Sequence, residues 1–116
     1  MILLPWPAKE LSPNARTHYL TKAKFAKRAR ATATWATLES KTKIMGSGLI
    51  QLNLTFCPPT PRNRDFDNLI SSMKSAIDGI ADGLKVNDSR FRINSIKIGE
   101  VGKPGKVLVE VLELDA

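Results

Sequence analysis

The sequence has few of the residues that bind transition metals or form disulfides. Its 116 residues include a single cysteine, Cys57, and a single histidine, His18. A disulfide framework, a cysteine-rich zinc site and a multi-histidine metal centre within one chain are therefore excluded. A nucleophilic Ser-His or Cys-His mechanism is also unattractive with one histidine. Cys57 precedes two prolines, and we interpret it as a small core residue.

Long apolar runs are absent as well. No run approaches the roughly 20 residues that a helix needs to cross a bilayer, so we expect no membrane association. The first residues, Met1–Pro7, lack a basic segment and contain two prolines, so we expect no signal peptide. We therefore expect a reducing, cytoplasmic environment.

Size and composition indicate one globular domain over residues 1–116. Hydrophobic residues make up 42% of the chain and charged residues 25%, which is typical of a folded protein rather than a disordered one. A chain of this length can bury roughly two-thirds of its unfolded surface. It can therefore build one hydrophobic core.

The positive charge is concentrated in one segment. The chain has 18 basic and 11 acidic residues, a net charge of +7. Eight basic residues and only Glu39 as an acid lie between Arg16 and Lys43, so this segment carries the whole net charge. Such a distribution is typical of a surface that binds a polyanion, although a solvated helix face has the same composition. The segment includes six candidate DNA-binding residues: Arg16, Lys22, Lys24, Lys27, Arg28 and Arg30.

The apolar pattern predicts an α+β fold. Residues 17–43 are rich in alanine and lysine and lack glycine and proline, which predicts a long helix with a thin apolar stripe that includes Leu20, Trp35 and Leu38. Residues 49–56 alternate between apolar and polar, which predicts a half-buried strand. We expect the order β-α-β-α-β-β, with helices packed on one small mixed sheet. The predicted elements are a strand at 2–4, a helix at 17–43, a strand at 49–56, a helix at 68–83, and strands at 91–99 and 106–113.

Acidic residues cluster between a proline-rich loop and the second predicted helix. In an extended backbone, Asp65 and Asp67 project to the same side and repel each other, a cost that a cation offsets. Mg²⁺ or Mn²⁺ is the usual hard cation for such oxygen ligands. Arg62 and Arg64 would suit a phosphate at that metal, and Asp88 offers a third carboxylate. Asp67 is equally suited to be a helix N-cap, and Asp88 suits an ordinary turn.

At these positions the sequence resembles the RusA-type Holliday-junction resolvases of bacteria and their phages. Residues 64–69, Arg-Asp-Phe-Asp-Asn-Leu, match the family's D-x-D-N-L core at the start of a helix. Residues 87–89, Asn-Asp-Ser, lie where the family has a carboxylate pair, and the final strands lie where it has a hairpin. Residues 4–7 and 12–16 resemble its N-terminal signature. The resemblance covers nearly the whole chain.

The resemblance implies an Mg²⁺-dependent enzyme, with Mn²⁺ as an alternative metal. Such an enzyme is a homodimeric crossover junction endodeoxyribonuclease that cuts four-way DNA junctions symmetrically, in the cytoplasm at the nucleoid. Asp65, Asp67 and Asp88 would be its metal-binding catalytic acids. Carboxylate-held Mg²⁺ can activate water and stabilise charge on phosphate, which phosphodiester hydrolysis requires. A two-fold dimer supplies two matched sites for a nearly two-fold junction.

Two positions depart from the family pattern. Ser71 stands where the family usually has a lysine, and Asn87 replaces the first acid of its late pair. Lys74 lies three residues after Ser71, on roughly the same helix face, and is our candidate for the missing catalytic lysine. Two alternatives remain: a noncatalytic nucleic-acid-binding relative with the same fold, and a small basic module whose partner is a protein.

Overall fold

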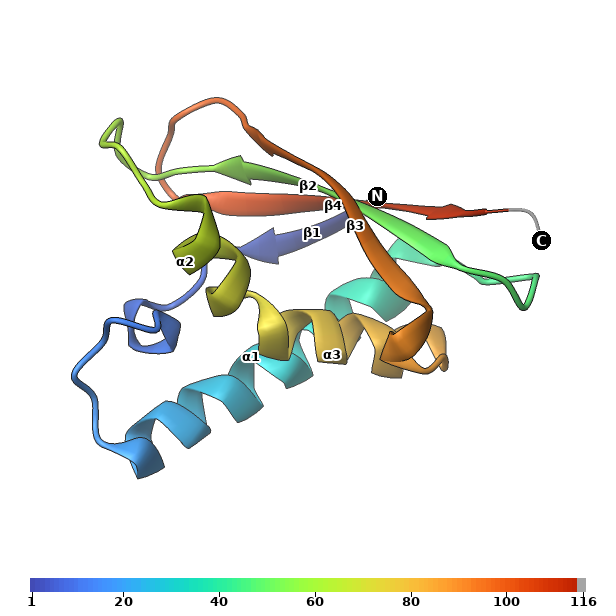
Figure 1. Cartoon of the computed structure of the whole chain (residues 1–116), viewed down its shortest axis with the longest axis horizontal. Helices are drawn as coiled ribbons and strands as arrows, with labels where there is room; N and C mark the ends of the chain where they lie inside the picture. The colour runs from blue at the N-terminus through green and yellow to red at the C-terminus, as the bar shows by residue number, and fades with distance from the viewer. Residues whose placement is uncertain (115–116) are drawn as a thin grey trace.

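The chain folds into one mixed β-sheet with its helices packed against one face. The computed structural model describes residues 1–114 (Figure 1). The α+β fold with a small mixed sheet is confirmed, and the strands lie in the order β1-β4-β2-β3. The strands are β1 (Ile2–Pro5), β2 (Ile50–Cys57), β3 (Phe91–Ile98) and β4 (Lys106–Glu113); the helices are α1 (Tyr19–Ser40), α2 (Phe66–Ser72) and α3 (Lys74–Leu84), with short 3-10 turns η1 (Lys9–Leu11) and η2 (Asp88–Arg90).

The last two strands do not form the expected hairpin. β4 pairs antiparallel with both β1 and β2, whereas β3 pairs parallel with β2. β2 therefore lies between β3 and β4. The connecting loop passes over the end of β2, where the N–H of Gly99 donates to the Phe56 carbonyl (2.8 Å) and that of Gly102 to the Pro58 carbonyl (3.0 Å). These two hydrogen bonds hold the crossover in place of a tight turn.

The alternation predicted for the central strand is confirmed. Ile50, Leu52, Leu54 and Phe56 are completely buried on the face that the helices cover. Val107 and Val109 of β4 are equally buried beside them. Complete burial of a side chain of this size contributes roughly 1.5–3 kcal/mol, so this inner face is the main source of stability.

The second predicted helix is divided in two. Met73 separates α2 from α3, and its N–H donates to the Ile70 carbonyl (3.0 Å), three residues back, which tightens the last turn of α2. The Ser72 hydroxyl donates to the Asn68 carbonyl (2.8 Å) in the same turn. The Met73 side chain is 1% exposed, so the break places a long apolar side chain in the core.

Helix α1 packs on α3 through small residues rather than through its large apolar ones. A Cβ atom added at Gly79 would lie 2.9 Å from the Ala33 Cβ, and one at Gly83 would lie 2.7 Å from the Thr37 Cβ. Ala33 and Thr37 are fully buried, whereas Trp35 is 68% exposed. The predicted stripe of Leu20, Trp35 and Leu38 was therefore wrong: these side chains lie on the exposed face of α1.

Helix α1 is also shorter than predicted, because Lys41 adopts a left-handed conformation (φ 57°) that ends it. None of the helices within residues 1–114 combines the length and the apolarity that crossing a lipid bilayer would require.

Candidate functional site

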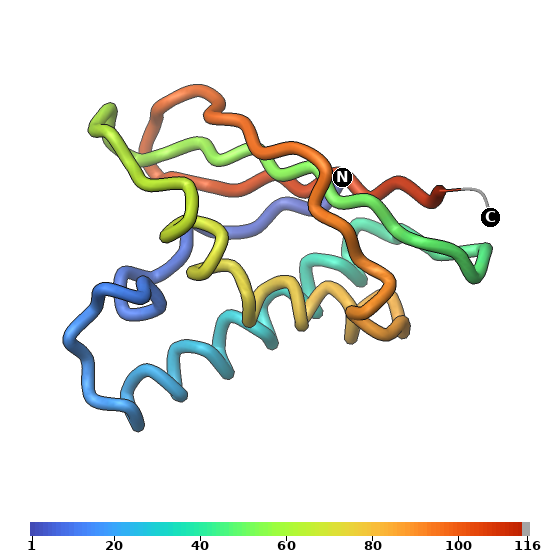
Figure 2. The backbone as a smooth tube through the Cα atoms, viewed as in Figure 1, coloured from blue at the N-terminus to red at the C-terminus, as the bar shows by residue number. Residues whose placement is uncertain are grey.

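Two of the segments that carry the family resemblance, the N-terminal signature and the start of the D-x-D-N-L core, line one surface groove. This groove, which we call the α2 groove, has a volume of about 720 Å³ and lies between the N-terminal loop and the start of α2. Figure 2 shows the blue N-terminal loop running beside the olive turns of α2. Although the two segments are far apart in the sequence, their side chains line the same hollow: Ser12, Asn14 and Arg16 from one, and Arg62, Asp65 and Asn68 from the other.

Asp65, rather than Asp67, caps the helix at this groove. Its Oδ1 accepts hydrogen bonds from the backbone N–H groups of Asp67 (2.8 Å) and Asn68 (3.4 Å). Asp67 lies in the first turn of α2 with an exposed side chain. Our interpretation of Asp67 as the N-cap was therefore wrong, because α2 begins two residues earlier than predicted. Oδ2 of Asp65 takes no part in the cap.

Arg64 holds the loop before α2 in place. One guanidinium nitrogen donates to the carbonyls of Thr60 (2.8 Å) and Arg62 (3.0 Å), and the other donates to the Thr60 hydroxyl (3.0 Å). The guanidinium carbon lies 5.1 Å from the ring centre of Trp6. Partial burial, with a smaller contribution from the positive charge of Arg62, lowers the pKa of Arg64. Arg64 thus joins the loop to the N-terminal segment.

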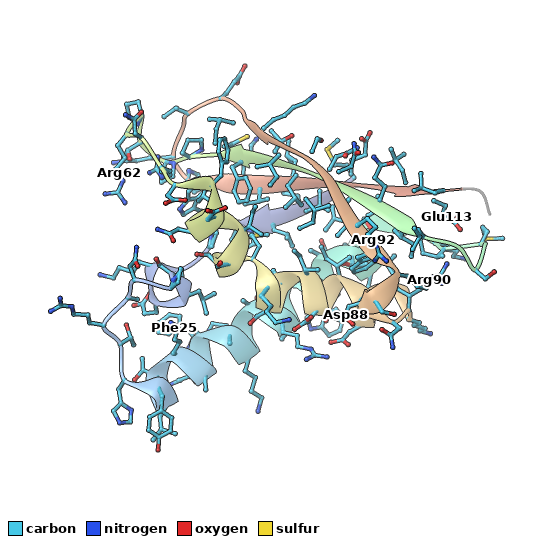
Figure 3. The ribbon with its side chains drawn as sticks, viewed as in Figure 1. Phe25, Arg62, Asp88, Arg90, Arg92 and Glu113 are labelled. Carbon is cyan, nitrogen blue, oxygen red and sulfur yellow. The ribbon has the colours of Figure 1, made fainter. Side chains whose placement is uncertain are left out.

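Asp88 lies elsewhere, in a shallow crevice beside α3. This feature, the Asp88 crevice, has a volume of about 340 Å³ and is also lined by Ser71, Lys74 and Asp78. Ser71 and Lys74 line this crevice together, although they belong to α2 and α3 rather than to one continuous helix. Figure 3 shows the separation: Arg62 projects from the loop before α2, whereas Asp88 lies near the far end of α3.

The three predicted metal ligands do not form one metal site in a single chain. Among residues 1–114, no group of three or more carboxylate, histidine or cysteine side chains is arranged to hold a metal ion. Asp65 lines the α2 groove while Asp88 lines the Asp88 crevice, and α2 and α3 separate the two residues in the sequence. One chain therefore does not fit the three-carboxylate site that the resemblance implies.

The structure divides the predicted DNA-binding residues into two groups. Arg16, Lys24, Lys27 and Arg62 are exposed and donate no side-chain hydrogen bond to any other part of residues 1–114. The others have intramolecular partners. Arg30 pairs with Asp82 (2.6 and 3.0 Å), the Lys22 ammonium donates to the Ser12 carbonyl (3.3 Å), and Arg28 lies over the ring of Phe25.

Two neighbours of the candidate residues were missed from the sequence. Trp6 lines the α2 groove and supports Arg64, a contact that no sequence pattern indicates. Asp78 accompanies Lys74 and Asp88 in the Asp88 crevice. The signal for Asp78 was present in the sequence, because it follows Lys74 by four residues in a helix and so lies on the same face.

Comparison with known proteins shows what this chain is related to. No model of a known protein family matches the chain. An "Uncharacterized protein" from Xylella fastidiosa (strain Temecula1) is 36% identical to it over 117 aligned positions, which cover 95% of this chain and 74% of the relative. Identity at this level over nearly the whole domain shows common descent. The chain therefore belongs to the same family as this Xylella fastidiosa protein.

Proposed function

We propose that this protein binds branched DNA and, as a homodimer, cleaves it in the manner of the RusA-type junction endonucleases. The observation that carries the proposal is the α2 groove. Two segments of the resemblance, though not residues 87–89, line this groove, and two exposed arginines, Arg16 and Arg62, lie in the same hollow as the Asp65 carboxylate. A groove with these residues can receive a phosphate backbone.

The exposed cations would supply the affinity. Arg16 and Arg62 are placed to contact phosphates at the α2 groove, and Lys24 and Lys27 extend the positive surface along the first half of α1. Cations on phosphate oxygens bind without reading base sequence, which suits recognition of a branch by its shape. Arg64 would act indirectly, by positioning the loop that carries Arg62.

A single chain does not bring together all the groups that cleavage is predicted to require. Since Asp65 and Asp88 line separate hollows, a single subunit holds two partial sets of the predicted catalytic groups. We expect paired cuts only from an assembly that also provides the two-fold symmetry of a junction. The proposal therefore predicts that cleavage activity and dimer formation are lost together upon dilution.

The test of cleavage uses a labelled four-way junction with Mg²⁺. We expect paired nicks from the unmodified protein and none from Asp65→Asn or Asp88→Asn. Glu100→Gln is the matched control, because it removes one exposed carboxylate in the β3–β4 loop, which lines a different hollow. Activity that persists in both aspartate variants, or that is lost in Glu100→Gln, would contradict the proposed roles.

A second candidate, a noncatalytic DNA-binding protein, is favoured by the hydrogen bonds of Asp65. An aspartate that caps a helix has a structural reason to be present. This candidate predicts junction binding with Mg²⁺ but no product at any protein concentration. The remaining alternative, a protein-binding module, predicts little salt-sensitive affinity for DNA. DNA binding through several phosphates should instead weaken about 10³-fold between 50 and 200 mM salt.

A further inference from the structure

An apolar cavity lies under the N-terminal segment, separate from the two hollows described above. Its volume is about 240 Å³. It is lined by the end of β1 and the chain that follows it, by the middle of α1 and by the junction of α2 and α3. Figure 3 shows Phe25 on the side of α1 that faces the N-terminal segment. The walls are mostly apolar and include Trp6, Leu11, Phe25, Ala29, Met73 and Ala76.

The cavity has one charged group in its wall. Arg28 lines it, and its guanidinium carbon lies 5.3 Å from the ring centre of Phe25. Within residues 1–114, Arg28 forms no ion pair with a carboxylate. The other polar side chains of the wall are two hydroxyls, and that of Ser72 already donates to the Asn68 carbonyl. The cavity thus offers an apolar interior and one cation without a carboxylate partner.

We propose that this cavity binds a small aromatic monoanion, with its ring among the apolar side chains and its carboxylate on Arg28. The size is suitable, because an apolar cavity of about 150 Å³ holds a benzene molecule. A nucleobase suits the cavity less well, since the walls offer few partners for its polar edge and unpaired polar groups are costly to bury. Charge complementarity selects an anion over a neutral ring.

The cavity shares a wall with the α2 groove. Trp6, Pro7, Ala8 and Ser72 line both hollows, so the N-terminal segment forms a shared wall. Trp6 also carries Arg64 on its face, and Arg64 holds the loop that presents Arg62. The proposal does not depend on DNA binding, because the cavity has its own walls and its own cation.

Benzoate is the probe, and the full chain is used throughout. Saturation-transfer NMR measures contact between protein and benzoate. Fluorescence of a Trp35→Phe protein, in which Trp6 is the remaining tryptophan, reports the site. We expect saturable binding that alters Trp6 emission, and weaker binding of the neutral analogue benzyl alcohol. Loss of the charge in Arg28→Gln should weaken benzoate binding about two- to fivefold, because Arg28 is exposed and water screens its charge.

The second part of the test enlarges a side chain in the cavity wall. Ala29→Leu adds three carbon atoms at the cavity wall and should abolish binding. Ala23→Leu makes the same change at an exposed position of α1 and should leave binding intact. Thermal unfolding of both variants verifies that they are folded. Absence of saturable benzoate binding, or binding that is unaffected by both Arg28→Gln and Ala29→Leu, would overturn the proposal.

Discussion

Single residues show how local hydrogen bonds change an expected role. From the sequence, Asp65 was a metal ligand and Arg64 a phosphate ligand. In the structure, the Asp65 carboxylate accepts hydrogen bonds from two backbone N–H groups. The Arg64 guanidinium donates hydrogen bonds to two backbone carbonyls. Both side chains organise the loop that leads into α2. A substitution at either position therefore changes structure as well as charge, and tests of function need variants that separate the two effects.

Asp65 allows such a separation. Asparagine caps a helix about as well as aspartate, whereas alanine does not. We expect Asp65→Ala to lower the free energy of unfolding by about 1 kcal/mol and Asp65→Asn to lower it by a few tenths at most. Urea denaturation measures both. Asp67→Ala, at the neighbouring exposed carboxylate, is the control; a loss as large as that of Asp65→Ala would contradict the assigned cap.

Gly79 is the residue at which α1 and α3 approach most closely. A Cβ there would lie 2.2 Å from the Arg30 carbonyl oxygen, a backbone atom that cannot turn aside. Although alanine gains up to about 1 kcal/mol in helix propensity, the overlap should cost more, about 1–3 kcal/mol. We therefore expect Gly79→Ala to destabilise the protein in urea denaturation. Gly102→Ala, with no atom within 4 Å, should be neutral; similar losses at both glycines would refute this packing.

At the scale of elements, side chains tie distant segments together. The Arg30–Asp82 pair joins α1 to α3, and Arg30 holds the pKa of Asp82 below its ordinary value, chiefly by hydrogen bonding. At the end of β4, the Glu113 carboxylate accepts hydrogen bonds from the backbone N–H groups of Met45 (2.9 Å) and Gly46 (2.6 Å). These backbone hydrogen bonds, in that order, lower the pKa of Glu113. The loop before β2 is thereby held to β4.

The lowered pKa of Glu113 predicts a pH dependence of stability. Its stabilising effect is complete above the ordinary pKa of 4.5. As the pH falls below that value, the unfolded chain takes up the proton first, so the free energy of unfolding falls until the folded carboxyl is also protonated. We expect Glu113→Gln to be less stable at neutral pH and to converge with the unmodified protein in acid, once the folded carboxyl is also protonated. Urea midpoints across this range measure the effect; parallel curves would contradict it.

For the whole molecule, the exposed charge on one side of α1 predicts the salt dependence of DNA binding. Each phosphate contact contributes about 0.9 to the slope of log K against log salt. We expect Lys24→Gln/Lys27→Gln to weaken binding to all junctions and to reduce that slope by about 2. Fluorescence anisotropy over a salt series measures it.

The matched control for this salt series removes the same charge near the β3–β4 loop. Lys103→Gln/Lys106→Gln takes away two exposed lysines that line a different hollow from the α2 groove. The slope should be unchanged in this variant. An equal decrease in both pairs would place the DNA-binding surface outside α1.

The sequence by itself determined the fold class and most of its elements. Alternation in residues 50–56 predicted the central strand, because a period of two places every second side chain in the core. The alanine- and lysine-rich segment predicted α1, since its composition favours a helix without requiring packing. Such signals depend only on neighbouring residues, so tertiary packing does not change the element that they predict. The position of the acidic and basic motifs at the start of α2 was readable for the same reason.

Only the tertiary structure decided which residues meet. The insertion of β2 between β3 and β4 depends on long-range pairing that no local pattern encodes. Gly79 and Gly83 let α3 approach the face of α1 that carries the small residues Ala33 and Thr37. Trp35 therefore lies on the exposed face of α1, contrary to the sequence prediction. The tertiary structure also placed Arg16 in the same groove as Asp65 and Asp88 in a different hollow. Side-chain identity supplied the chemistry, but the distances between the side chains came from the packing of the helices on the sheet.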